Sequence, residues 1–267
     1  MSGPAPATPG GMQQERPTAG AVYVYGIVPA ATAQQWTHDD GMQVRVITAG
    51  DLAAIVSDLP PEYVPGRRED LERHRRVLSA AIERMTAIPM RFGIVMDSDE
   101  LVRERLLEHH AGEIGELLRR LDGQVQMMIR AFYTEDALLL DVLEANPDLK
   151  ERSAALSGLP EDETRNERIQ LGELIAQAVE ERRAEVEGVL VEQLKPYASD
   201  IRVDPANSER VALQAQLLVP REMRPQLDTV VRELSDRLSG VLTFRYVGPL
   251  PPYTFADLSL EDPDEDE

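Results

Sequence analysis

The chain of 267 residues contains no cysteine, and this absence excludes several kinds of protein at once. Without thiols there is no disulfide framework and no thiolate zinc site, and nothing indicates an oxidising compartment. Long apolar runs are also missing, since none comes near the roughly 20 residues that span a bilayer as a helix. The segment 1–20 is rich in Pro, Gly, Ala and Thr and lacks the apolar stretch of a signal peptide. We therefore expect a disordered tail over 1–20 and a soluble, cytoplasmic protein.

Basic residues are scarce relative to acids, with 28 Lys and Arg against 48 Asp and Glu and a net charge of −20. Such a chain repels phosphate groups, so we expect no nucleic-acid partner and no adhesion to an anionic membrane. The segment 256–267 alone carries seven acids and no base, and it is expected to be a second disordered tail. The rest of the chain is acidic too.

Motifs of catalysis are absent as well. The sequence has no nucleophile elbow, no Gly-x-Gly-x-x-Gly and no P-loop. His74 and His110 fall on apolar helical stripes, where histidines are usually part of a core. His109 stands one helical turn before Glu113, which could form half of a metal site or an ordinary i,i+4 contact. A metal-dependent enzyme that uses His109, His110 and Glu113 stays open as an alternative, but we predict no enzyme and no cofactor.

The first half of the chain alternates short strands and helices. Its opening run is β-branched and aromatic on both faces, which is typical of a strand in the middle of a sheet. The turn Ala49-Gly50-Asp51 indicates a hairpin. The expected strands are Ala21–Val28, Val44–Thr48, Leu52–Asp58 and Ile88–Val95, and the expected helices are Ala31–Trp36, Arg67–Thr86 and Ser98–Leu121.

The second half repeats this pattern with a helical insertion. A long helix over Asp162–Leu194 ends before Pro196, because proline disfavours the helical state of the residue before it. The other expected helices are Glu135–Ala145, Pro147–Leu156 and Met223–Leu238, and the strands are Gln124–Tyr133, Asp200–Val203, Arg210–Val219 and Val241–Val247. The order β-α-β-β-α-β occurs twice and predicts an α+β fold with two ferredoxin-like domains, over 21–121 and 122–255.

Three segments, read in order, resemble the gas vesicle protein L/F family. The first is Tyr23-Val24-Tyr25-Gly26-Ile27, and the second is His74 followed by Pro89-Met90-Arg91-Phe92-Gly93. The third is the ending Gly248-Pro249-Leu250-Pro251-Pro252-Tyr253-Thr254-Phe255. The resemblance extends from about Tyr23 to Phe255. This chain departs from the family pattern at Leu250, where relatives usually have tryptophan, and at Gln126, where they usually have an acid.

The resemblance implies two domains related to the ferredoxin-like fold and an accessory or minor structural role in gas vesicle formation. It further implies binding to the hydrophobic shell protein and to other accessory proteins, with no cofactor. The motif residues with expected structural roles are His74, Pro89, Arg91, Phe92, Gly93, Gly248, Pro249, Pro252, Tyr253 and Phe255. In particular, we expect Phe92 to be buried and Gly93 to allow a close passage of backbone.

The candidate partner surface is one face of the first strand. Tyr23, Tyr25 and Ile27 alternate with Val22, Val24 and Val28, and a ferredoxin-like sheet has helices on one side only. One set therefore needs a cover, which is either a partner protein or, within the chain, the helix Ser98–Leu121 or the second domain. A function of another class also stays open, namely a tandem ferredoxin-like sensor of a small ligand.

Overall fold

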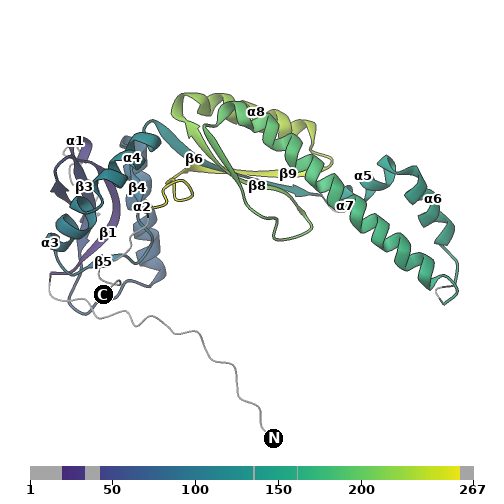
Figure 1. Cartoon of the computed structure of the whole chain (residues 1–267), viewed down its shortest axis with the longest axis horizontal. Helices are drawn as coiled ribbons and strands as arrows, with labels where there is room; N and C mark the ends of the chain where they lie inside the picture. Colours follow the sequence, from purple (N-terminus) through teal and green to yellow (C-terminus); the bar gives the residue numbers. More distant parts are fainter. Residues whose placement is uncertain (1–19, 34–42, 135, 161, 259–267) are drawn as a thin grey trace, which may run out of the picture. The chain divides into compact units, whose positions relative to one another are not determined.

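The computed structural model describes residues 20–33, 43–134, 136–160 and 162–258. The chain divides into two units, Met1–Arg120 with Ala256–Glu267 (unit 1) and Leu121–Phe255 (unit 2). Each unit contains one antiparallel sheet with helices beside it (Figure 1). The fold class is therefore α+β. The expected tail over 1–20 and most of the acidic tail over 256–267 lie outside the described residues.

Unit 1 is built around a sheet in which β1 is central. The strand order is β2-β3-β1-β4, and β5 also pairs with β1. Ala49 pairs with Leu52 across the expected hairpin, and Gly50 turns the chain with a φ of +54°. The elements are β1 (Val22–Pro29), α1 (Ala30–Ala33), β2 (Arg45–Ala49), β3 (Leu52–Asp58), α2 (Arg68–Arg84), β4 (Ile88–Pro89), β5 (Val95–Met96), α3 (Asp99–Leu101), the π-helical η1 (Val102–Glu108) and α4 (Ala111–Leu121).

The strand expected over Ile88–Val95 is interrupted. Its two ends, β4 and β5, both run antiparallel to β1, with Pro89 opposite Gly26 and Val95 opposite Tyr23. Between them the chain turns at Phe92 and Gly93, and Gly93 has a φ of +95°. A Cβ on Gly93 would meet nothing within 4 Å, so glycine is favoured there by its conformation and not, as expected, by lack of space.

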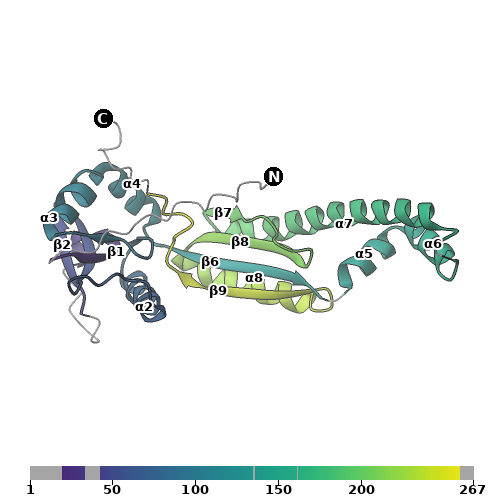
Figure 2. The same ribbon diagram turned by 90° about the horizontal axis from the view of Figure 1, so that it is seen from below.

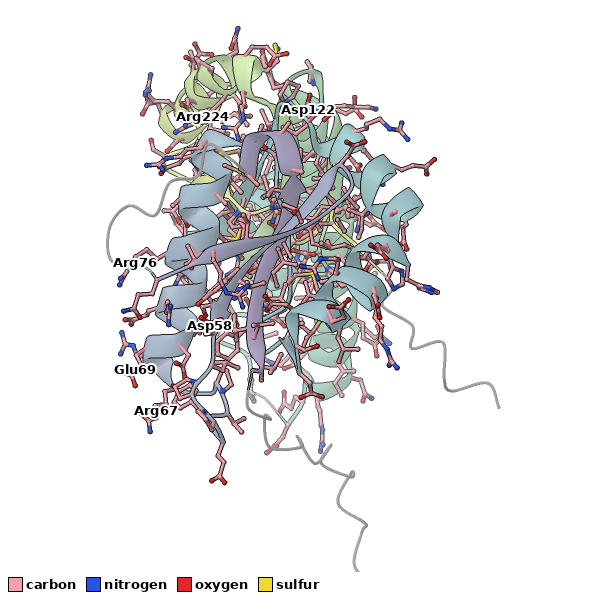
Figure 3. All side chains as sticks on the ribbon, turned by 90° about the vertical axis from the view of Figure 1, so that its left-hand side faces the viewer. Asp58, Arg67, Glu69, Arg76, Asp122 and Arg224 are labelled. Atoms are coloured by element: carbon pink, nitrogen blue, oxygen red, sulfur yellow. The ribbon has the colours of Figure 1, made fainter. Side chains whose placement is uncertain are left out.

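The sheet of unit 1 has helices on both faces. Figure 3 shows α2, which carries Arg76, on one side of the strands and the segment α3–η1–α4 on the other. β1 is consequently buried from Val22 to Val28, and Ile27 is fully inaccessible. The expectation that Tyr23, Tyr25 and Ile27 form an open partner surface is therefore wrong for this structure. α2 covers Tyr23 and Tyr25, and the segment that begins at Ser98 covers the opposite face of the sheet.

A bulge in β1 also changes which side chains share a face. The pairing of β1 with β3 shifts between Val24 and Gly26. Such a shift reverses the alternation beyond it, because one extra residue enters one strand. As a result Val28, and not Ile27, joins Tyr23 and Tyr25 in the hydrophobic cluster beneath α2.

The helix expected over Ser98–Leu121 contains a π-helical stretch. Ser98 caps its start as the sequence predicts, since the Ser98 hydroxyl accepts a hydrogen bond of 3.2 Å from the N–H of Leu101. The wider turns of η1 follow, and the N–H of His109 donates to the carbonyl of Glu104 at 3.0 Å. Val102, Leu106 and Leu107 are all buried there, next to β2 and β3.

Unit 2 follows the sequence prediction closely. Its strand order is β7-β8-β6-β9, all antiparallel. Both β6 and α6 begin and end at the predicted residues. The elements are β6 (Gln124–Tyr133), α5 (Ala137–Ala145), α6 (Pro147–Leu156), α7 (Arg165–Leu194), the 3-10 helix η2 (Lys195–Tyr197), β7 (Asp200–Val203), β8 (Val211–Pro220), the 3-10 helix η3 (Arg221–Met223), α8 (Arg224–Arg237) and β9 (Leu242–Leu250).

The core of unit 2 lies on one face of its sheet. Figures 1 and 2 show α8 and the end of α7 against that face. Alternate side chains of β6, such as Met127 and Ile129, pack there against Leu190 of α7 and Leu227 of α8. No helix of unit 2 lies against the other face among the described residues.

The helix α7 extends beyond this core. Its 30 residues correspond to about 45 Å at 1.5 Å per residue. The short helices α5 and α6 pack beside it, and Arg182 of α7 forms a 2.6 Å ion pair with Asp141 of α5. Packing within the chain therefore accounts for much of this long helix. No helix in the described part of the chain is both long enough and apolar enough to cross a membrane.

Candidate functional site

Four rings from three segments of the chain meet between β1 and α2. Tyr23 and Tyr25 of β1 lie with their ring centroids 4.7 Å apart, and His74 of α2 lies within 5.7 Å of both. Phe92, from the turn between β4 and β5, packs edge-on to His74 at 5.7 Å. The first two segments of the family motif are thus one cluster in space. Its Phe92 is only half-buried, which corrects the expectation of a fully buried ring.

Hydrogen bonds connect this cluster. The Tyr23 hydroxyl lies 2.9 Å from Nδ1 of His74 and accepts a bond of 3.0 Å from the N–H of Gly93. The backbone of Met90 also bonds to His74. Tyr23 and His74 therefore fasten the turn between β4 and β5 to β1 and α2, which is a structural role.

The pKa of His74 is lowered from its ordinary value of 6.5, because burial disfavours the imidazolium, and the bond to Met90 offsets this only in part. The unfolded chain therefore takes up a proton at this position more readily than the folded chain. We expect the free energy of unfolding to fall as the pH falls below about 6.5, by at most about 1.4 kcal/mol per pH unit for one proton.

Denaturant titrations at several pH values between 5.5 and 7.5 test this expectation, with His74→Gln beside the parent and His109→Gln as a control on an exposed histidine. The slope of stability against pH should become flatter in the His74 variant alone. An equal slope in the parent and in His74→Gln would contradict the assignment.

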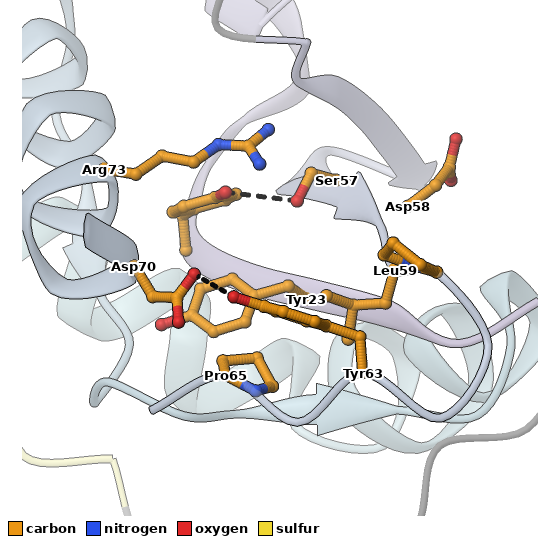
Figure 4. Close-up of a pocket in the computed structure, with 10 residues that line it drawn as sticks. Tyr23, Ser57, Asp58, Leu59, Tyr63, Pro65, Asp70 and Arg73 are labelled. Carbon is orange, nitrogen blue, oxygen red and sulfur yellow. Dashed lines mark hydrogen bonds between the residues drawn. The ribbon is translucent and has the colours of Figure 1, made fainter. Parts of the chain in front are cut away.

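A small pocket opens beside the cluster (Figure 4). Its volume is about 170 Å³. Two hydrogen bonds order its wall, one of 3.1 Å between the Tyr25 and Ser57 hydroxyls and one of 2.7 Å from the Tyr63 hydroxyl to Asp70. Ten residues line it, namely Tyr23, Tyr25, Ser57, Asp58, Leu59, Pro60, Tyr63, Pro65, Asp70 and Arg73.

Three groups of the pocket, Tyr25, Tyr63 and Asp70, have shifted pKa values. Burial raises the pKa of Tyr25, and the hydrogen bond to Asp70 raises the pKa of Tyr63, so both phenols stay neutral. Burial alone would raise the pKa of Asp70, but its bonds from Tyr63 and from the N–H groups of Gly66 and Arg67 outweigh this and lower it. The pocket therefore offers hydroxyls and an ionised carboxylate, without an activated nucleophile.

The third motif segment closes unit 2. The Gly248-Pro249 peptide bond is cis. Gly248 has a φ of +155°, which L side chains rarely adopt, and a Cβ there would lie 2.4 Å from Sδ of Met127, so glycine is favoured. Pro252 and Phe255 are buried and Tyr253 is exposed, and the guanidinium of Arg202 lies 5.3 Å from the centre of the Phe255 ring. This segment thus completes the sheet.

The two departures from the family pattern face each other. Gln126 of β6 is directly opposite Leu250 of β9. The buried Gln126 amide donates to Gln216 at 2.9 Å and to the Thr254 hydroxyl at 3.2 Å, and its oxygen accepts from the N–H of Thr254 at 3.1 Å. A carboxylate at this position could not donate either of the first two bonds. Gln126 therefore anchors the closing segment in a way that an acid could not.

The remaining candidates are not brought together. Arg91 is exposed, and Pro89 is buried in β4. The i,i+4 spacing predicts a contact between His109 and Glu113. In the structure it is His110, three residues before Glu113, that lies 3.8 Å from this carboxylate. In the described part of the chain no three histidine or acidic side chains are grouped so that they could hold a metal ion.

Sequence reasoning missed the pocket. Tyr63 and Asp70 were not singled out, because they are separated in sequence from β1 and join it only in the folded unit. One signal was available, since an acid three residues after the start of a helix often binds free backbone N–H groups, as Asp70 does with Gly66 and Arg67.

The chain is similar to gas vesicle proteins over nearly its full length. A profile described as "Gas vesicle synthesis protein GvpL/GvpF" matches residues 21–257. Gas vesicle protein F of Streptomyces sp. (strain CB03234) is 34% identical over 245 residues, which cover 89% of this chain and 100% of that protein.

Two crystal structures of gas vesicle proteins are similar to this chain over nearly its full length. The crystal structure of GvpF from Anabaena sp. PCC7120 has a TM-score of 0.79 at 25% identity and covers 90% of this chain and 99% of that one. GvpF from Microcystis aeruginosa has a TM-score of 0.70 at 28% identity and covers 89% and 99%. The chain is thus a protein of the gas vesicle class. It belongs to the GvpL/GvpF family of gas vesicle synthesis proteins, which confirms the resemblance read from its motifs.

Proposed function

We propose that this protein is an accessory or minor structural factor of gas vesicle formation, which binds the hydrophobic shell protein and other accessory proteins during assembly. The observation that supports this most is the match to gas vesicle proteins F over 89% of the chain and 100% of the relative. The strongly acidic composition is suited to keeping a sticky subunit dispersed. The proposal includes no catalytic step and no cofactor, and it places the protein in the cytoplasm and at the gas vesicle.

The proposal assigns both units to the ferredoxin-like topology. In each sheet the first and third strands of the unit are central and the second and fourth are outer, as the βαββαβ order requires. Because both faces of the first sheet are covered, the place left in unit 1 for a partner strand is an outer strand of the sheet, β2 or β4. In unit 2 the outer strands are β7 and β9. Main-chain hydrogen bonds at such edges capture an added strand.

Co-purification tests this function. The tagged full chain is produced together with the shell protein, and an unrelated protein of similar net charge takes its place in the control. We expect the shell protein to be retained by this chain and not by the control. Equal retention by both would attribute the capture to charge alone and would contradict the proposal, as would no retention at all.

A second candidate function is the sensing of a small ligand, which the pocket beside Tyr25 favours. Its converging hydroxyls and the Asp70 carboxylate are groups that bind a small polar molecule. If the pocket senses a ligand, replacing Ser57 by the bulkier leucine should abolish ligand binding and leave capture of the shell protein unchanged. Loss of capture in this variant, with the fold intact, would join the pocket to the assembly role.

A further inference from the structure

The helix-free face of the unit 2 sheet carries an arginine pair. Along β6, Met127, Ile129 and Ala131 point into the core, so Met128, Arg130 and Phe132 point to the opposite face. All three are half-buried. This face is defined here by Met128, Arg130 and Phe132 of β6, Gln214 of β8, and Thr243 and Arg245 of β9, and is called the open face.

Two like charges meet at its centre. Arg130 is directly opposite Arg245 on β9 and opposite Gln214 on β8. Residues directly opposite each other in an antiparallel pair have Cβ atoms about 5 Å apart, and like charges there are destabilising. Because acids outnumber bases in this chain, which has a net charge of −20, two adjacent arginines are not expected from the composition alone.

The pair is not neutralised within the described residues. Nε of Arg130 is buried without a hydrogen-bond partner, and neither guanidinium forms an ion pair there. The acids on the same face are Asp200 of β7 and Asp204, which directly follows β7, at the far edge of the sheet from β9. One of them, Asp204, already accepts bonds from Gln214 at 3.1 Å and Gln216 at 3.2 Å. A docked carboxylate cannot reach this inaccessible Nε, but it would supply charge-assisted hydrogen bonds to the terminal NH₂ groups of the two guanidiniums.

We propose that the open face binds an acidic, amphipathic segment of a partner protein. A carboxylate of the segment pairs with Arg130 and Arg245, which lie on neighbouring strands about 4.8 Å apart. Apolar side chains on either side of that carboxylate lie over Met128 and Phe132, two residues away along β6. The arrangement thus selects for an acid flanked by apolar residues. The inference takes from the proposed function only that the partner is a protein.

The test uses the full chain with Thr243→Cys, which introduces its only thiol because the parent has no cysteine. A fluorophore on that thiol reports on the open face, since Thr243 is opposite Phe132 and exposed. The probes are three short synthetic peptides of the repeat Leu-Ser-X-Ser, in which X is glutamate, serine or lysine, so that leucine and X lie on one face of an extended chain. We expect binding of the glutamate peptide alone, and weaker binding as salt rises.

The double variant Arg130→Glu/Arg245→Glu should weaken binding of the glutamate peptide by at least about tenfold. Its matched control is Arg232→Glu/Arg237→Glu, with the same change of charge on exposed positions of α8, against the opposite face of the sheet. Circular dichroism and thermal unfolding of both variants establish that they are folded.

Three results would overturn the inference. One is binding of the serine or lysine peptide as tightly as the glutamate peptide, and another is an equal loss of affinity in both double variants. The third is a change of the fluorophore signal in the absence of peptide, either with rising protein concentration or after removal of residues 257–267. That change would show that a second copy or the chain's own acidic end occupies the face. These three readouts do not involve the shell protein. A failed co-purification would therefore contradict the proposed function without contradicting this inference.

Discussion

Replacing Gly26 by alanine is expected to lower the free energy of unfolding by about 1–3 kcal/mol, as overpacking of a filled core does. Gly26 lies at the bulge of β1 and pairs with Pro89 of β4. A Cβ there would lie 2.7 Å from the carbonyl oxygen of Ile88 and 2.9 Å from Cδ2 of Leu78. The first of these atoms is backbone in a buried strand and cannot turn aside, so β4 itself must move.

Chemical denaturation with the parent as reference measures this loss. Gly188→Ala in α7 is the matched control, because an added Cβ there meets nothing within 4 Å. Alanine favours a helix over glycine by about 1 kcal/mol, so the control should gain stability while Gly26→Ala loses it. A Gly26 variant as stable as the parent would show that β1 and β4 are not in close contact in solution.

Replacing Tyr23 by phenylalanine is expected to cost about 1–3 kcal/mol, although the ring itself stays in place. The hydroxyl is bonded to both Nδ1 of His74 and the N–H of Gly93, so its loss leaves the buried ring nitrogen and the amide without this partner. Water has little access to replace it, because Tyr23 and His74 are exposed by only 4% and 1%.

The control for this substitution is Tyr197→Phe. Tyr197 is half-buried, and its hydroxyl forms no hydrogen bond with the described residues. Its loss should change the unfolding midpoint little. Hydrogen exchange of the Gly93 amide adds a local readout, and we expect it to accelerate in Tyr23→Phe. Equal midpoints for the two variants would mean that the Tyr23 bonds contribute nothing measurable.

Both predictions concern motif residues, and both are about packing. Four motif residues hold the interrupted strand of unit 1 against β1. Two belong to the first motif segment, Tyr23 and Gly26, and two to the second, His74 and Gly93. The motif by which the family is recognised therefore has a structural explanation here. The positions proposed for partner binding, Arg130 and Arg245, lie outside it and belong to unit 2.

The sequence by itself determined what depends on neighbouring residues. The ends of β6 and α6 follow from strict alternation and from Asn146-Pro147, and α7 ends at Leu194 because Pro196 stands two residues later. The cap at Ser98 is local too. The open face was also within reach, since the alternation of β6 puts Arg130 opposite the core side, although its pairing with Arg245 needs the strand register.

Only the tertiary structure decided the features that depend on contacts between distant segments. Whether β1 was covered on one face or two depended on where the segment from Ser98 packs. The bulge that exchanges Ile27 for Val28 on the face of Tyr23 is a property of the pairing with β3, and it leaves no mark in β1 alone. The turn at Gly93 and the pocket beside Tyr25 likewise arise where separate segments meet. Periodicity reports how one element alternates, whereas register and burial are set by the partner across the sheet.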